Sequence, residues 1–140
     1  MAVNVDSVGM ISNPASGHNR SQFQAIEQRI NRCTSIHHVV THSAQDIDAA
    51  LQTLAQQQVS VLAINGGDGT SSAILGRLLE TNPFSKPPMI ALLPGGTANM
   101  NAGDIGIKGS LKKAVNAFCA WCEHGDAAEA RTEQRRLLRV

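Results

Sequence analysis

The sequence predicts an open, mostly parallel α/β sheet with helices on both of its faces. Short apolar runs alternate along the chain with segments in which apolar residues recur at helical spacing, an order typical of βαβ units. The run VSVLAIN at 59–65 is apolar almost throughout, as expected of a strand that helices cover on both faces. Three of the four expected strands lead directly into loops of small and hydroxyl-bearing residues. Because ligands of such sheets bind at the carboxyl ends of the strands, we expect these loops to meet in space.

The first half of the chain is expected to form two strands and two helices. The first strand covers 5–12 and ends in the turn sequence NPASG, after which a helix over 21–33 begins with Ser21 as the N-cap of a capping box. The second strand covers 35–41, and Ser43 is the expected N-cap of the next helix. That helix carries the clearest apolar stripe in the sequence, formed by Ile47, Ala50, Leu51, Leu54 and Ala55.

The second half repeats this order around two glycine-rich loops. After VSVLAIN and the sequence GGDGT, a helix should begin near Asp68 or Thr70, and the strand MIALLP at 89–94 follows a Pro-containing break. The loop PGGTANMNAGDIG then leads to a helix capped by Ser110 and ended by Gly125. The apolar stripes of the two helices comprise Ile74, Leu75, Leu78 and Leu79, and then Leu111, Ala114, Val115, Phe118 and Cys122.

The last fifteen residues do not continue the alternating pattern. A chain of 140 residues is about the size of one domain, yet its final sequence RRLLRV resembles the start of a strand with nothing after it to pair with. We therefore expect one domain over 1–125 and the beginning of a further domain, in a longer protein, over 126–140. The arginines of this segment are expected on a solvated strand face rather than on acidic lipid headgroups: Arg131, Arg135, Arg136 and Arg139.

The composition excludes several classes of function. A net charge of +1 and an aromatic content of 3% offer neither the basic face nor the stacking surface of a nucleic-acid-binding protein. No apolar run approaches the roughly 20 residues that cross a bilayer, and the N-terminus lacks the pattern of a secretion signal. We therefore expect a cytoplasmic protein that contacts membranes only peripherally. The sequence leaves open whether the chain forms homo-oligomers.

The cysteine and histidine clusters are better explained by packing and exposure than by metal binding. Cys119 and Cys122 have the C-x-x-C spacing, but on a helix they share one face, and the sequence lacks the second cysteine pair of a zinc site. His37 and His38 point to opposite faces of the expected second strand, and His42 follows it. We expect buried, reduced thiols and histidines at the surface.

The sequence GGDGT has the chemistry of a phosphate-binding loop. Gly66 and Gly67 let a ligand approach the backbone closely, and a helix starting there adds amide groups and a partial positive charge. A carboxylate beside phosphates is repulsive unless a cation or a proton lies between them. Mg²⁺ is the natural mediator, so Asp68 suggests phosphoryl transfer. The alternative is that Asp68 only caps the helix. The loop lacks the lysine of a Walker A motif and does not follow the G-x-G-x-x-G pattern.

Three motifs, in this order and each after an expected strand, resemble the diacylglycerol kinase catalytic domain family: Asn13–Gly17 (NPASG), Gly66–Thr70 (GGDGT) and Pro94–Asn99 (PGGTAN). That family includes bacterial lipid kinases and is related to sphingosine and ceramide kinases. The GGDGT element alone is shared with NAD kinases and 6-phosphofructokinases, so the first and third motifs favour a lipid kinase.

The resemblance implies a fold of the NAD kinase and diacylglycerol kinase N-terminal domain type. It also implies an enzyme that uses ATP and Mg²⁺ to phosphorylate a lipid hydroxyl such as that of diacylglycerol. Asp68 would be the catalytic and metal-binding residue. The resemblance further implies a second, β-sandwich domain that supplies much of the lipid site, so the isolated chain should have little or no kinase activity. The implied nucleotide-binding residues are Asn13, Ser16, Gly17, Thr41, Gly66, Gly67, Asp68, Gly69, Thr70, Gly96 and Thr97.

The chain departs from the family pattern at two places. Ser72-Ala73 stands where members often have Asn-Glu, and Asn99-Met100 where they have Asn-Asp. These differences concern contacts with the lipid hydroxyl and the metal more than nucleotide binding. Two alternatives therefore stay open, namely an enzyme similar to NAD kinase and a nucleotide-binding module without catalysis.

Overall fold

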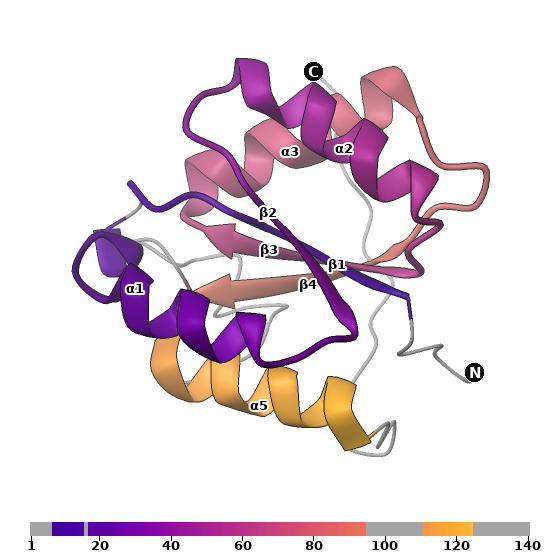
Figure 1. Ribbon diagram of the computed structural model, residues 1–140. Coiled ribbons are helices and arrows are strands. Elements are labelled where there is room, and N and C mark those ends of the chain that lie inside the picture. The colour runs from indigo at the N-terminus through magenta and orange to yellow at the C-terminus, as the bar shows by residue number, and fades with distance from the viewer. Residues whose placement is uncertain (1–6, 16, 95–110, 125–140) are drawn as a thin grey trace.

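Four parallel strands form a single sheet in the order β2-β1-β3-β4 (Figure 1). The computed structural model describes residues 7–15, 17–94 and 111–124, to which all structural statements below refer. The expected α/β fold with a parallel sheet is confirmed. The strands are β1 (Val8–Ser12), β2 (Ile36–Val40), β3 (Val61–Gly66) and β4 (Met89–Pro94).

Among the described residues, two helices cover each face of the sheet. Helices α1 (Gly17–Asn31) and α5 (Leu111–His124) pack on one face, and α2 (Gln45–Gln56) and α3 (Asp68–Thr81) pack on the other (Figure 1). The chain moves from β1 outward to β2 and then returns to the other side of β1 to form β3. The helices after β1 and β3 therefore lie on opposite faces, and the boundary between these strands is the switch point where ligands of such sheets bind.

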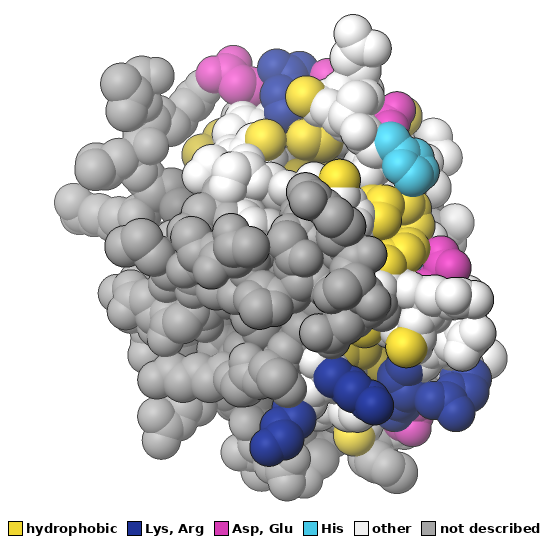
Figure 2. All heavy atoms as spheres, turned by 90° about the vertical axis from the view of Figure 1, so that its left-hand side faces the viewer, with side chains coloured by type: hydrophobic (Ala, Val, Ile, Leu, Met, Phe, Trp, Pro, Cys, Tyr) yellow, Lys and Arg dark blue, Asp and Glu magenta, His cyan; other side chains and the backbone are white. Residues whose placement is uncertain are grey.

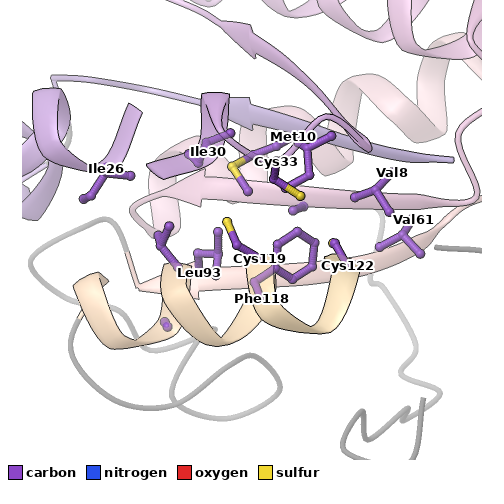
Figure 3. Close-up of a cluster of buried hydrophobic side chains, with 14 residues drawn as sticks. Val8, Met10, Ile26, Ile30, Cys33, Val61, Leu93, Phe118, Cys119 and Cys122 are labelled. Atoms are coloured by element: carbon purple, nitrogen blue, oxygen red, sulfur yellow. The ribbon is translucent and has the colours of Figure 1, made fainter. Parts of the chain in front are cut away.

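The strands alternate side chains between two cores. On the α1 and α5 face, Val8 and Met10 of β1 pack with residues of β3, β4 and both helices (Figure 3). On the α2 and α3 face, Gly9 leaves room for α2, because a Cβ at this position would lie 2.9 Å from a methyl carbon of Leu54. In the described ranges, no helix is both long and apolar enough to span a bilayer.

The cysteines are part of the first core. Cys33, Cys119 and Cys122 are buried and form no disulfide, and Figure 3 shows Cys119 and Phe118 pointing from α5 toward the sheet. Burial raises the thiol pKa to about 11 for Cys119 and to about 12 for Cys122. The expectation that C-x-x-C serves packing is confirmed, since thiols with such pKa values are poor nucleophiles at neutral pH.

Two predicted helix starts were wrong. Helix α1 begins at Gly17, so Ser21 lies within the helix and is not its N-cap. The reason is that Asn13 Oδ1 accepts a hydrogen bond from the Ala15 amide at 3.0 Å, a turn that leads the chain into the helix almost at once. The N-cap of α2 is Ala44 rather than Ser43.

A carboxylate of the first turn of α2 orders the backbone that precedes this helix. Asp46 Oδ2 accepts a hydrogen bond from the His42 amide at 2.9 Å, so a side chain of the first turn, not the expected serine, orders the preceding backbone. Helix α1 ends at Asn31, two residues before the predicted end. The predicted caps Ser110 and Gly125, and the arginines of the last segment, lie outside the described residues.

Candidate functional site

The first two glycine-containing loops meet at the carboxyl edge of the sheet, as predicted. Asn13 Nδ2 donates a hydrogen bond of 3.0 Å to Thr70 Oγ1, and these residues are 57 positions apart in sequence. The backbone amide of Asn13 also donates to the backbone carbonyl oxygen of Asn65 at 2.9 Å, which extends the β1–β3 pairing by one residue. We call this pair of contacts the Asn13–Thr70 clamp. It joins the start of the NPASG loop to the first turn of α3.

The last residue of β3, Gly66, packs closely against the side chain of the same threonine. A Cβ on Gly66 would lie 2.6 Å from Thr70 Cγ2 and 2.7 Å from Thr70 Cβ, distances that real Cβ atoms do not show. Gly66 is therefore required by the close approach of Thr70 and not by an unusual backbone angle. Because Thr70 is β-branched and sits on a helix, its side chain has little freedom to move away.

Helix α3 begins directly at this point. Gly67 occupies the N-cap position, Asp68 is the first helical residue, and the Ser71 amide donates to the Gly67 carbonyl oxygen at 2.9 Å. The helix N-terminus, with its amide groups and partial positive charge, thus lies at the carboxyl edge beside Asn13. The alternative that Asp68 is the N-cap is wrong in position, because Gly67 takes that place.

Gly69 differs from Gly66 in its surroundings. Gly69 is exposed, and a Cβ built on it would meet none of the residues that the structure describes within 4 Å. Packing against the described part of the chain therefore does not require a glycine at this position of the first turn. An open position next to the helix N-terminus is what a bound phosphate group would need.

The other predicted site residues are placed as follows. Thr41 is buried directly after β2, and its amide donates to the Ser12 carbonyl oxygen at 2.9 Å, so it lies at the same edge as Asn13. Gly17 is the first residue of α1. Gly66 faces Pro94 in the β3–β4 register, so the third motif starts next to the second. Ser16, Gly96 and Thr97 lie outside the described residues.

A row of polar side chains crosses three strands at this edge, and the sequence did not single it out. Ser12 and Asn65 are fully buried, and Asn65 Nδ2 donates to Ser12 Oγ at 3.2 Å. His38 Nε2 lies 2.7 Å from the same Ser12 Oγ. We call these three residues the polar row. Strand alternation places all three on the α1 and α5 face, which the periodicity could have indicated once the strand register was known.

His38 is therefore not the surface residue that was predicted. It is half-buried, and the ring of Phe23 in α1 lies over it with 6.4 Å between ring centroids. Burial disfavours the charged imidazolium and lowers the pKa of His38 to about 4. The prediction failed because α1 covers one face of β2, although β2 is an edge strand of the sheet.

The lowered pKa of His38 makes folding stability depend on pH. Since the folded pKa of about 4 lies below the ordinary value of 6.5, the unfolded chain binds the proton more readily between these values. The free energy of unfolding should fall as the pH drops from 6.5 to 4.5, with a share of at most about 2 kcal/mol due to His38. Urea unfolding of the chain and of His38→Gln at both pH values measures this share. Equal pH slopes for the two proteins would contradict the assignment.

Basic side chains gather on one side of this end of the molecule. Figure 2 views the end at which the strands terminate, and Lys and Arg side chains cluster along its lower part, on the side of α1 and α5. Lys112 and Lys113 lie in the first turn of α5, while Arg29 lies in the last turn of α1, toward the opposite end of the sheet. Arg29 forms an ion pair of 2.8 Å with Glu123 and so links the two helices.

The family departure at Ala73 has a structural consequence. Ala73 is partly buried and packs against the core on the α2 and α3 face, whereas Ser72 is exposed. Position 73 therefore contributes an apolar contact in this chain, where family members often place a carboxylate. The second departure, at Asn99-Met100, lies outside the described residues.

Comparisons with known proteins agree with this arrangement. The family model for the diacylglycerol kinase catalytic domain matches residues 7–127. A curated protein of Enterobacter sp. (strain 638), named "Probable lipid kinase YegS-like", is 34% identical over 106 residues. That match covers 76% of this chain and 35% of the relative, so the chain spans about a third of the relative's length.

The fold is shared with solved structures. A crystal structure of a diacylglycerol kinase from Bacillus anthracis str. Sterne superposes with a TM-score of 0.65 at 24% identity, over 82% of this chain and 42% of that one. At this identity the likeness concerns the fold alone. The matched family model carries the assignment, because it covers the sheet, the four helices that the structure describes and both loops of the Asn13–Thr70 clamp. The chain belongs to the diacylglycerol kinase catalytic domain family.

Proposed function

We propose that this chain is the ATP-binding domain of a lipid kinase that transfers the γ-phosphoryl group of ATP to a lipid hydroxyl, such as that of diacylglycerol. The observation that supports this most is the Asn13–Thr70 clamp at 3.0 Å. It fixes the N-terminus of α3 at the switch point of the sheet, where the helix amides can bind phosphate oxygens. Family membership supports the kinase class, and the clamp supports the proposal that the phosphates bind at this edge of the sheet.

We assign the site residues to three groups. Gly66 and Gly67 shape the turn, while Asp68, Gly69 and Thr70 present the first amides of α3 and a hydroxyl group to the phosphates. Asn13 orients Thr70 through the clamp. The remaining proposed contacts to the nucleotide come from Ser16, Gly17, Thr41, Gly96 and Thr97.

The proposed magnesium site depends on Asp68. Within the described residues, no three His, Cys, Asp or Glu side chains gather in a way that would hold a metal ion by themselves. Mg²⁺ in kinases commonly binds one or two carboxylates together with phosphate oxygens, and one acid at the first position of α3 fits that pattern. When bound, the ion would neutralise charge on the phosphates.

We propose that a second domain completes the enzyme. The chain spans about two fifths of the matched crystal structure and about a third of the curated relative. The lipid site and further catalytic groups would lie in the remainder, so the chain alone should bind ATP with little or no turnover. We place the protein in the cytoplasm, with peripheral access to the membrane that holds its lipid substrate.

A nucleotide-binding module without catalysis is the second candidate, and Ala73 favours it. An alanine packed against the core cannot coordinate a metal or polarise a hydroxyl, whereas a carboxylate at this position could do either. An enzyme similar to NAD kinase shares only the GGDGT element and is less well supported by the family match.

One assay of the full-length parent protein distinguishes these functions. The protein is incubated with ATP, Mg²⁺ and either diacylglycerol vesicles or NAD, and labelled product is measured alongside ATP binding. Phosphorylation of diacylglycerol supports the proposal, phosphorylation of NAD indicates the NAD kinase alternative, and binding without turnover indicates the module. Lipid phosphorylation by the 140-residue chain at the full-length rate would contradict the proposed need for a second domain.

Replacing Gly69 with alanine should separate ligand binding from folding. The added methyl group meets none of the described residues within 4 Å, so the free energy of unfolding should stay the same or rise slightly. If the phosphates lie against Gly69, the affinity for ATP should fall by about tenfold or more, equivalent to roughly 1.4 kcal/mol. Binding by isothermal titration calorimetry and unfolding in urea measure the two effects on the same sample.

Gly76→Ala is the matched control for Gly69→Ala. Gly76 is an exposed residue of the same helix whose Cβ position is also open, but it lies about two turns beyond the first turn. Its replacement should stabilise the chain by up to about 1 kcal/mol and leave ATP affinity unchanged. Equal ATP affinities for Gly69→Ala and the unmodified chain would show that the phosphates do not bind against this turn.

A further inference from the structure

We propose that His38 is a positioning residue for the nucleotide site, acting through the polar row on the two strand ends that carry the Asn13–Thr70 clamp. This inference rests on the proposed function for what the strand ends bind. His38 does not touch the clamp itself. Its route to the clamp is a chain of side-chain hydrogen bonds that joins β2 to β1 and β1 to β3.

Each inner member of the polar row sits directly before a residue of the site. Ser12 precedes Asn13, the donor of the clamp, and Asn65 precedes Gly66, on which Thr70 packs. Both Ser12 and Asn65 are fully buried, so their rotamers are set by their hydrogen bonds and close neighbours rather than by solvent. A change in the orientation of Ser12 or Asn65 therefore shifts the backbone from which the clamp is built.

The hydrogen-bond directions give His38 a defined part in this row. The side-chain nitrogen of Asn65 can only donate, so Ser12 Oγ is the acceptor of that hydrogen bond. The Ser12 hydroxyl proton therefore needs an acceptor of its own. His38 Nε2, at 2.7 Å, is positioned to accept that proton. If Nε2 instead donated, the buried Ser12 hydroxyl would need a further acceptor, and a buried donor without one costs on the order of 1–3 kcal/mol. We therefore assign the neutral tautomer of His38 with its proton on Nδ1.

Two surrounding features hold the ring in this state. The tilted contact with Phe23 of α1 restricts the ring plane, and burial keeps the pKa of His38 near 4, so that the ring is neutral at pH 7. A neutral ring leaves Nε2 available as an acceptor. The contact with Phe23 also connects the polar row to α1, whose first residue, Gly17, is one of the proposed site residues.

The neighbouring histidine provides a matched control. His37 and His38 are consecutive in β2, so His37 points to the opposite face, toward the layer of α2 and α3, and cannot reach Ser12. His38→Leu keeps an apolar side chain of similar size but removes the acceptor. His38→Gln restores a polar group that can accept a hydrogen bond near the position of Nε2. His37→Leu tests the effect of losing a histidine from this strand in general.

The experiment measures ATP affinity at pH 7.5 with Mg²⁺ for the chain and these three variants, with urea unfolding of each. We expect His38→Leu to weaken binding about fivefold to tenfold, corresponding to roughly 1–1.4 kcal/mol. His38→Gln should recover most of the affinity, and His37→Leu should bind like the unmodified chain. Unchanged affinity in His38→Leu, or a loss in His38→Gln as large as in His38→Leu, would overturn the proposal.

Nitrogen-15 NMR of the unmodified chain tests the same inference without a ligand and without any variant. The two ring nitrogens of His38 should report a neutral imidazole with the proton on Nδ1 and a hydrogen-bonded Nε2; a proton on Nε2 would overturn the assignment. If the unmodified chain does not bind ATP, the proposed function fails, and backbone amide shifts of His38→Leu decide the inference. Shifts that reach Asn13 and Thr70 support it, and shifts confined to β2 overturn it.

Discussion

Replacing Gly66 with alanine is expected to lower the free energy of unfolding of this chain by about 3 kcal/mol and to weaken ATP binding. The new methyl group would stand 2.6 Å from Thr70 Cγ2 and 2.7 Å from Thr70 Cβ, so either the strand end or the first turn of α3 must move. Movement of that turn would also break the hydrogen bond from Asn13 Nδ2 to Thr70 Oγ1. Urea unfolding and calorimetric titration with ATP measure the two losses.

Two further variants identify the cause of the Gly66 effect. Gly76→Ala introduces the same methyl group into an open position and should be neutral or stabilising. Thr70→Ser, combined with Gly66→Ala, removes the nearest carbon while keeping the hydroxyl group of the clamp, and should recover part of the stability. A Gly66→Ala chain as stable as the unmodified one would show that Thr70 does not pack against this glycine.

Replacing Asp68 with alanine or asparagine is expected to abolish lipid phosphorylation by the full-length parent, with a fall in kcat of at least about 10²–10³. Asp68 is the first residue of α3, beside the amides proposed to bind phosphate, and it is the acid assigned to Mg²⁺. Asparagine preserves the size of the side chain and removes the charge, so the fold should be retained. Initial rates with diacylglycerol vesicles, at saturating ATP and Mg²⁺, measure the effect.

Asp48→Asn is the control for Asp68. Asp48 lies on α2 and forms a bidentate pair with Arg77 of α3, with both oxygen–nitrogen distances at 2.8 Å. Both side chains are about half exposed, so the pair adds little stability and stands apart from the proposed chemistry. Its loss should leave the rate unchanged. Full activity in Asp68→Ala would reduce Asp68 to a favourable charge at the helix N-terminus.

Much of the fold was predictable because hydrophobic periodicity is a local property of the sequence. The apolar run before Gly66 identified β3, and the stripe around Leu51 identified α2 with its buried face. The start of α1 was missed because it depends on one hydrogen bond, from the Ala15 amide to Asn13 Oδ1, that the pattern of apolar residues does not encode. Helix ends follow from such local polar contacts more than from periodicity.

The candidate site was predictable in its motifs but not in its connections. Glycines followed by an acid after a buried strand indicated a phosphate loop at Gly66–Thr70, and the strand order then brought Asn13 to Thr70. The polar row could not be predicted, because its contacts join residues 26 and 53 positions apart and require the register of β1 with both neighbours. A histidine in a strand gives no sign by itself of whether a helix covers it.

We propose that the carboxyl edge formed by the Asn13 loop and the first turn of α3 binds the phosphates of ATP. Titration of the nitrogen-15-labelled chain with ATP and Mg²⁺, followed by backbone amide shifts, tests it most directly. We predict saturable shifts concentrated at Asn13 and at Gly67–Thr70, with Gly76 on the same helix unaffected. No shifts at ATP concentrations of about 10 mM, where even a weak site with a Kd of about 1 mM would be filled, or shifts centred away from this edge, would contradict it.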